Sequence, residues 1–94
     1  MKTIPQNHPV RKAISALSSG AYYDEVYHWW DKVVAILQSN DILPDTSPDI
    51  LECPVIYNQT GRGVVNLANT DSRLIYEWYR MPETYRWEIV CYLS

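Results

Sequence analysis

Residues 73–93 read RLIYEWYRMPETYRWEIVCYL, and this stretch decides the fold. In its second half, from Trp87 onward, apolar side chains occupy every second position, which is the pattern of a half-buried strand. Pro82 fits the second position of a turn that reverses the chain before this strand. Residues 73–81 are rich in aromatic and β-branched side chains, so we expect a second strand there. A helix capped by residues 69–72 is the alternative for the same segment.

Two helices are expected in the N-terminal part of the chain. The first begins at Pro9, whose fixed φ suits the first turn of a helix, and ends before Gly20. The second covers about residues 22–38, where apolar side chains fill one half of the helical wheel and polar ones the other half. An apolar half that wide exceeds what the short first helix covers. We therefore expect the second helix to lie on a sheet or on a partner as well.

The connection after these helices, residues 39–53, contains two prolines and several acidic residues. It is expected to be irregular, with one short turn at residues 48–51. Further on, β-branched residues flank the sequence TGRG at residues 60–63, which predicts a hairpin whose turn uses the two glycines. The strands expected on either side of this turn are residues 53–59 and 63–67.

Together these elements predict an α+β fold in which two N-terminal helices pack on one face of a three- or four-stranded antiparallel sheet, in two layers. The expected order is two helices followed by all the strands. The chain of 94 residues is short enough for one domain, because chains divide into separate cores only well above this length. Within residues 1–94 we expect a helical part at 7–38, an acidic connector at 39–53 and a sheet part at 54–94.

The formal net charge is −3, from 8 basic and 11 acidic residues, which argues against a general affinity for nucleic acid or for an anionic membrane. No apolar run approaches the roughly 20 residues of a membrane-spanning helix. The first residues also lack the apolar stretch of a secretory signal. We therefore expect a cytoplasmic protein whose two cysteines, Cys53 and Cys91, stay reduced.

Residue types capable of catalysis form no recognisable constellation in the sequence. His8 lies at a helix start, where a capping role fits, and His28 falls in the polar half of the second helix. Cys91 alternates with core residues and is expected to be buried and unreactive. The cysteines and histidines lie far apart and show no metal-ligand spacing. We expect no catalytic residue, no cofactor and no metal.

The outer face of the predicted sheet is the main candidate binding surface. If Leu74 and Trp87 point toward the helices, the period-2 alternation points their neighbours outward. The competing interpretation is a solvated sheet face with cross-strand pairs such as Arg86 with Glu77. This surface mixes arginine and tyrosine with aliphatic side chains, and arginine and tyrosine are enriched at interface hot spots. The outward set consists of Arg73, Ile75, Tyr79, Arg86, Val90 and Tyr92.

The acidic connector is an alternative binding surface, which could dock on a basic partner. Its aspartates and glutamate lack the spacing and the central glycine of a calcium loop, so a solvated connection is the simpler interpretation. The carboxylates come from Asp41, Asp45, Asp49 and Glu52.

These observations predict a small non-enzymatic protein-binding domain, either an adaptor or an inhibitor of a larger enzyme. The expected partner is a protein, with no membrane contact, and the chain could also form a homo-oligomer. The alternative function is nucleic-acid or nucleotide binding, with tyrosines of the sheet face stacking on bases and its arginines meeting phosphates. For a macromolecular contact through the sheet, we expect Tyr79, Arg86 and Tyr92 to dominate.

Overall fold

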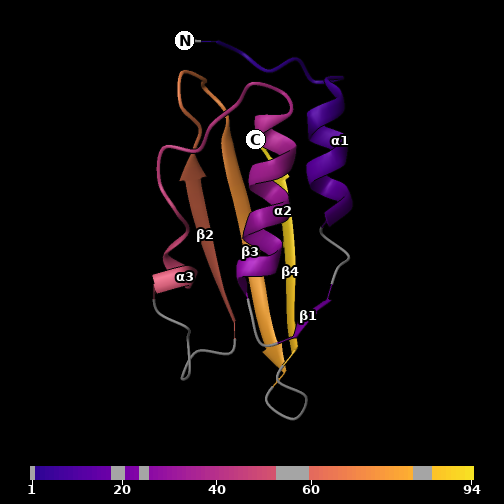
Figure 1. Cartoon of the computed structure of the whole chain (residues 1–94), viewed down its shortest axis with the longest axis vertical. Helices are drawn as coiled ribbons and strands as arrows, with labels where there is room; N and C mark the ends of the chain where they lie inside the picture. Colours follow the sequence, from indigo (N-terminus) through magenta and orange to yellow (C-terminus); the bar gives the residue numbers. More distant parts are fainter. Residues whose placement is uncertain (1, 18–20, 24–25, 53–59, 82–85) are drawn as a thin grey trace.

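The computed structural model describes residues 2–17, 21–23, 26–52, 60–81 and 86–94. The four strands form one antiparallel sheet in the order β1-β4-β3-β2 (Figure 1). The α+β class with an antiparallel sheet is therefore confirmed. The elements, in chain order, are α1 (Pro9–Ala16), β1 (Ala21–Tyr23), α2 (Val26–Gln38), α3 (Asp49–Glu52), β2 (Thr60–Asn66), β3 (Arg73–Met81) and β4 (Arg86–Leu93).

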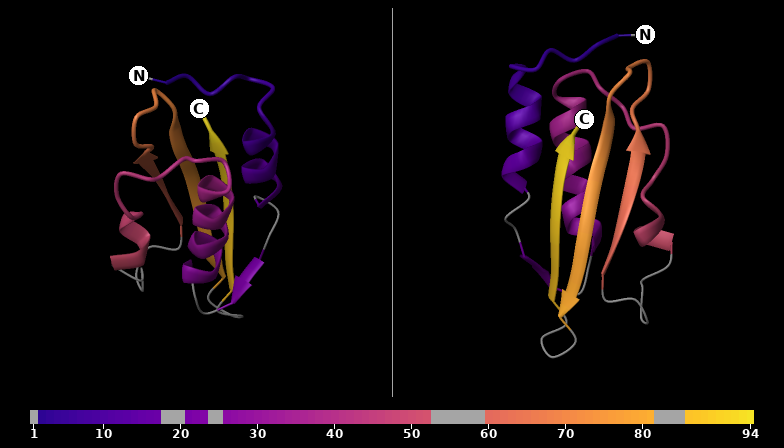
Figure 2. Two further views of the ribbon diagram at one scale, coloured as in Figure 1. Left: turned by 45° about the horizontal axis from the view of Figure 1, so that its top comes forward. Right: turned by 180° about the vertical axis from the view of Figure 1, so that it is seen from behind.

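Both longer helices lie on the same side of the sheet. In the rear view of Figure 2, β2, β3 and β4 lie in front and α2 lies behind them. Burial alternates accordingly: Leu74 and Tyr76 of β3 and Ile89 of β4 are buried toward the helices, while the residues between them are partly or well exposed. No described helix or strand covers the other side of β2, β3 and β4, which we call the outer face.

The first helix begins as the sequence predicts. The backbone N–H of Val10 donates to Nδ1 of His8 at 3.0 Å, so His8 caps the helix and Pro9 occupies its first turn. The predicted capping role of His8 is confirmed. Ile14, one turn beyond Val10, is fully buried with it against the sheet. The helix ends at Ala16, and the expected end signal at Gly20 lies outside the described residues.

The second helix starts later than predicted. Residues 21–23 form the short strand β1, which pairs antiparallel with β4, and α2 begins only at Val26. The prediction that this helix begins at about residue 22 is therefore wrong. Tyrosines favour a half-buried strand, and the edge of β4 offers unpaired backbone groups for pairing, so tertiary contacts outweigh helix periodicity here. The chain order becomes helix, strand, helix, short helix and three strands.

The hairpin turn predicted at residues 60–63 is also wrong, because these residues belong to strand β2. Gly61 pairs with Trp78 and Gly63 with Tyr76. A Cβ atom at either glycine would overlap the aromatic ring of its partner, so the glycines admit rings that lie across the edge strand. The strand expected at 53–59 lies outside the described residues.

The segment 73–81 is a strand rather than a helix, and the last strand also follows the prediction. The turn expected around Pro82 lies outside the described residues. Between β3 and β4 the register places Glu77 opposite Val90 and Arg86 opposite Met81. The proposed cross-strand pair of Arg86 with Glu77 is therefore wrong.

The connector between α2 and β2 contributes to the core as well as carrying charge. Ile42, Pro48 and Ile50 are buried, and the last of these belongs to α3. The backbone N–H of Asp45 donates to the carbonyl of Asn66 at 2.8 Å, so the connector runs along the end of the edge strand β2. The short turn expected at 48–51 corresponds to helix α3 at 49–52.

Arg11 joins the N-terminal segment to the end of β4. Its guanidinium donates to the main-chain carbonyls of Ile4, Pro5, Leu93 and Ser94 at 2.6 to 3.1 Å. An arginine side chain provides five N–H donors in one plane, which suits such multiple contacts. One side chain of α1 therefore fixes two distant parts of the chain beside each other.

Helix α2 supplies much of the core, with Trp29, Val33 and Leu37 fully buried. Leu37→Ala removes apolar contacts and leaves a cavity, so we expect the free energy of unfolding to fall by about 2 to 5 kcal/mol. Chemical denaturation checks this value. The exposed neighbour Gln38→Ala is the control and should change stability by less than about 0.5 kcal/mol. Equal stabilities of the two variants would contradict the burial of this face.

The fit between β2 and β3 makes a second prediction. Gly63→Ala places a methyl group in the space of the Tyr76 ring, which is itself buried and cannot move into solvent. We expect a loss of about 1 to 3 kcal/mol in stability from this overpacking. Arg62→Ala changes the adjacent, well-exposed residue and should change stability far less. A Gly63→Ala protein that melts like the wild type would show that the ring does not lie there.

Candidate functional site

The outer face presents its side chains in rows that run across three strands. Val64 of β2 pairs with Ile75 of β3, and Ile75 pairs with Tyr92 of β4, so these three residues form one row. Cross-strand neighbours on one face lie close enough for their side chains to touch. The adjacent rows are Arg62–Glu77–Val90 and then Thr60–Tyr79–Glu88, and Asn66–Arg73 lies on the other side of the first row.

Exposed apolar side chains concentrate on this face. Among the described residues, six large hydrophobic side chains are exposed, and four of them belong to these rows. Ile75, between them, is half-buried by its neighbours. Large apolar side chains gathered on one face mark interaction sites more often than the same residues scattered singly. The four are Val64 (49% exposed), Tyr79 (42%), Val90 (47%) and Tyr92 (46%).

The described charges on the outer face balance. Nε of Arg62 lies 3.8 Å from Oε1 of Glu77, and both side chains are more than half exposed, so this ion pair contributes little to stability. Arg73 and Glu88 are the other described charged residues of the rows, and both are exposed. The described charges therefore sum to zero, two arginines against two glutamates.

A shallow depression of about 480 Å³ lies at the end of the face where β2 begins. Arg62, Tyr79, Glu88 and Val90 contribute to its lining, so it combines an aromatic ring and an aliphatic side chain with charges of both signs. Such a surface can receive one projecting side chain of a partner protein.

The structure brings together most of the residues that the sequence predicts for this surface. Ile75, Tyr79, Val90 and Tyr92 lie within the rows, with Arg73 at one end of β3. The backbone of Arg86 lies in β4, opposite Met81, but its side chain is outside what the structure describes.

Sequence reasoning missed the contribution of β2. Arg62 and Val64 belong to the outer face because residues 60–66 form a strand and not a turn. The signal was present in the alternation of the larger residues Thr60, Arg62 and Val64 with the two glycines. Glycine at every second position of a strand leaves room for aromatic rings of the neighbouring strand, so this alternation also fits a strand.

The acidic connector does not form one cluster. Asp41 has a left-handed φ of 58° just after α2, Asp45 lies beside the end of β2, and Asp49 begins α3. All three are exposed, and the side chain of Glu52 is outside the described part of the chain. Within the described ranges, no three histidine, cysteine, aspartate or glutamate side chains are placed to hold a metal ion.

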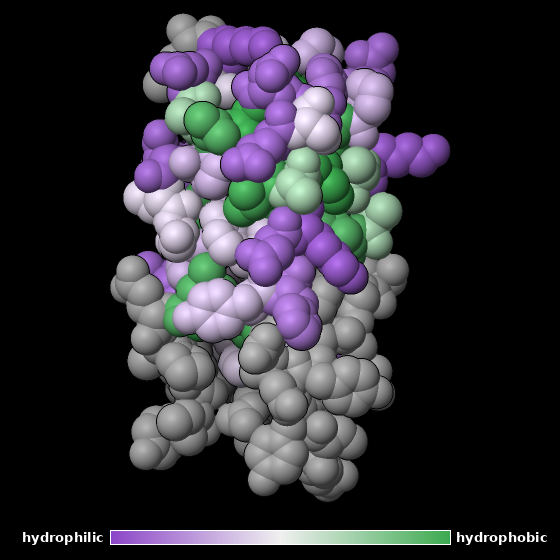
Figure 3. Space-filling view, viewed as in Figure 1, coloured by the Kyte–Doolittle hydropathy of each residue, from purple (hydrophilic) through white to green (hydrophobic). Residues whose placement is uncertain are grey.

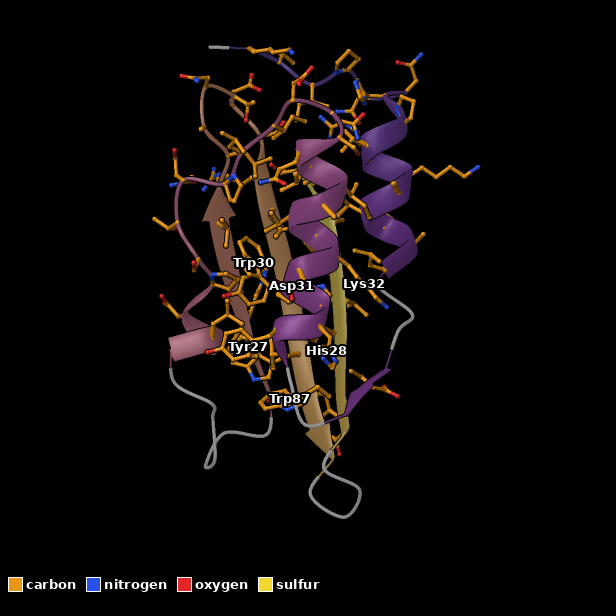
Figure 4. The ribbon with its side chains drawn as sticks, in the orientation of Figure 1. Tyr27, His28, Trp30, Asp31, Lys32 and Trp87 are labelled. Atoms are coloured by element: carbon orange, nitrogen blue, oxygen red, sulfur yellow. The ribbon has the colours of Figure 1, made fainter. Side chains whose placement is uncertain are left out.

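The helix side of the molecule offers a different surface. Figure 3 shows many hydrophilic residues on its described part, with apolar residues visible between them. Figure 4 shows Tyr27 and Trp30 on the side of α2 toward α3, with His28 and Lys32 on the other side. The hydroxyl of Tyr27 donates to the carbonyl of Leu51 at 3.0 Å, so this exposed ring helps to hold α3. His28 is exposed, as predicted.

The inner side of the sheet holds an aromatic cluster of Trp29, Trp30, Tyr76 and Trp78. The ring centroids of Trp29 and Tyr76 are 5.3 Å apart, and those of Tyr76 and Trp78 are 5.9 Å apart. Burial raises the pKa of the Tyr76 hydroxyl, and the nearby carboxylate of Asp49 raises it further. The indole N–H groups of Trp29 and Trp78 are buried without a hydrogen-bond partner among the described residues. This cluster packs the core.

Cys91 is 2% exposed in β4, as its alternation predicts. Its Sγ lies 3.5 Å from the carbonyl of Ile14 in α1, which places the thiol between sheet and helix. A thiol in this position lacks the access that a nucleophile needs. The predicted burial of Cys91 is confirmed, and Cys53 lies outside the described residues.

Comparison with known proteins finds no matching family model, no matching curated protein and no matching solved structure. Among the described residues, no helix has both the length and the apolar character needed to cross a membrane.

The buried hydroxyl of Tyr76 predicts how stability changes at alkaline pH. An unfolded chain ionises this tyrosine near its ordinary pKa of 10.0, whereas the folded protein holds the proton to higher pH. The stabilisation is therefore present below about pH 10 and is lost as the pH rises through the folded pKa. In Tyr76→Phe, the free energy of unfolding should fall less between about pH 9 and 11 than in the wild type.

The control for this experiment is Tyr92→Phe, which removes an exposed hydroxyl from the outer face. It should retain the alkaline slope of the wild type, measured by urea denaturation at each pH. A Tyr76→Phe variant with the wild-type slope would show that this hydroxyl does not couple to folding.

Proposed function

We propose that this chain is a small non-enzymatic protein-binding domain, an adaptor or an inhibitor of a larger enzyme, that contacts its partner through the outer face. The observation that supports this function best is the gathering of exposed Val64, Tyr79, Val90 and Tyr92 on the side of the sheet that no described element covers. Tyrosines bury a large area with few rotatable bonds, which makes them frequent anchors of protein interfaces.

The charge of the outer face favours a protein over a nucleic acid as its partner. A surface that binds phosphates needs excess positive charge, but Arg62 and Arg73 are balanced by Glu77 and Glu88. The exposed rings of Tyr79 and Tyr92 are the feature that supports the alternative, because bases stack on such rings. Nucleic-acid binding is therefore the second candidate function.

The proposal includes a cytoplasmic location. The buried thiol of Cys91 suits a reducing compartment, where thiols persist without disulfide formation.

Photo-crosslinking in the native host tests the proposed contact directly. A photoreactive amino acid at position 90 lies in a middle row of the outer face, on β4, and the same group at position 35 is exposed on α2. We expect illumination to give a covalent adduct of protein from position 90 and far less from position 35. Both sites are exposed, so the substituted proteins should fold alike.

Nuclease treatment then identifies the class of the adduct. An adduct whose size is unchanged by nuclease supports protein binding, whereas a nuclease-sensitive adduct supports the second function. Equal labelling from positions 90 and 35, or none from position 90, would contradict a docking role for the outer face.

A further inference from the structure

The outer face has the properties of a surface that fits a copy of itself. Its described charges are two arginines and two glutamates, so two such faces meet without net repulsion. Arg62 and Glu77 pair within one row, whereas the remaining two charges, Arg73 and Glu88, lie apart along the strands. Arg73 lies at the start of β3 beside the row Val64–Ile75–Tyr92, and Glu88 lies three rows away on β4. An antiparallel arrangement of two faces therefore brings opposite charges together.

The register defines how two copies would meet. A two-fold axis running across the strands, between the Val64–Ile75–Tyr92 row and the Arg62–Glu77–Val90 row, places each of these rows over the other in the second copy. Tyr92 then meets Val90 of the second copy. Arg73 meets Tyr79 of the second copy and lies within one strand of Glu88. Each contact occurs twice, as in any two-fold interface.

We infer that the partner of the outer face is a second copy of this chain, and that two sheets pack face to face in a homodimer. The inference rests on the proposed function, since it assigns a partner to the same surface. Two antiparallel sheets that pack in this way keep their strands within about 30° of each other, with their side chains interdigitating. The Val64–Ile75–Tyr92 rows of the two copies then lie side by side at the centre of the interface, each facing the Arg62–Glu77–Val90 row of the other copy.

The size of the face agrees with a dimer interface. Nine residues of β3 at about 3.4 Å each and the three strands of the outer face, about 4.8 Å apart, cover roughly 440 Å² in flat projection. The accessible surface of projecting side chains exceeds a flat projection. The face is nevertheless smaller than the about 800 Å² that each partner buries in a standard protein interface, and its size fits a dimer that dissociates on dilution.

Sedimentation equilibrium of the purified chain tests the inference. We expect a dimer that dissociates on dilution within the range of about 0.1 to 500 µM. Arg73→Glu sets two carboxylates opposite each other across the interface and should weaken the dimer at least about tenfold. Glu88→Arg should weaken it similarly through two cations. The double variant Arg73→Glu with Glu88→Arg restores opposite charges and should recover most of the affinity.

The matched control is Lys12→Glu, which makes the same change in net charge at an exposed position of α1. It should leave the dimer unchanged, and circular dichroism melting should show that every variant folds. A chain that stays monomeric over the whole range overturns the inference. So does a dimer that weakens equally in Lys12→Glu, or one that the double variant fails to restore.

Crosslinking from position 90 separates this inference from the proposed function. An adduct of two copies of this chain supports both. An adduct with a different protein, from a chain that sediments as a monomer, supports the proposed function and rejects the homodimer. A monomer that yields no protein adduct rejects both.

Discussion

The ring of Tyr76 lies where the layers of this protein meet, and its position constrains all of them. It contacts Trp29 of α2 and Trp78 of its own strand, with centroid distances of 5.3 and 5.9 Å, and it lies across Gly63 of β2. Its hydroxyl faces the start of α3, where the backbone N–H groups of Asp49 and Ile50 act to lower its pKa against the larger effect of burial. A residue larger than glycine at position 63 would displace this ring and would thereby disturb its contacts to α2 and α3.

The one-sided cover of the sheet follows from this arrangement. The large inward side chains of β3 and β4 need a cover, and α1 and α2 provide it on one side only. Strand alternation then leaves every second residue of β2, β3 and β4 on a side that no described element covers. The chemistry of those residues, and not the fold, determines whether that side is solvated or binds a partner.

Elements whose signals are local could be predicted from the sequence. Strands that are defined by their pairing partners could not be assigned correctly in the same way. Alternation from Trp87 onward predicts β4 and the burial of Cys91, and the position of His8 before Pro9 predicts a cap. Strand β1 was hidden because residues 22–23 also fit the helical periodicity of α2, and only the edge of β4 distinguishes the two. Residues 60–62 of strand β2 were missed because its glycines resemble turn residues until the opposing rings are known, whereas residues 63–66 lie within the strand expected at 63–67. The outer face was therefore predicted from two of its three main strands.

The basic residues of the outer face are arginines and not lysines, which also fits the proposal that this face is an interface. Lysine is a common device for keeping exposed strands soluble and unpaired, yet the chain has no lysine after Lys32, so β2, β3 and β4 use arginine alone. Arginine is enriched at interfaces and lysine is depleted there, because the guanidinium is more weakly hydrated and can stack on aromatic rings. A face selected only for solvation would tolerate lysine at the positions of Arg62 and Arg73. Arginine beside exposed tyrosines is instead the composition expected where water is removed on binding.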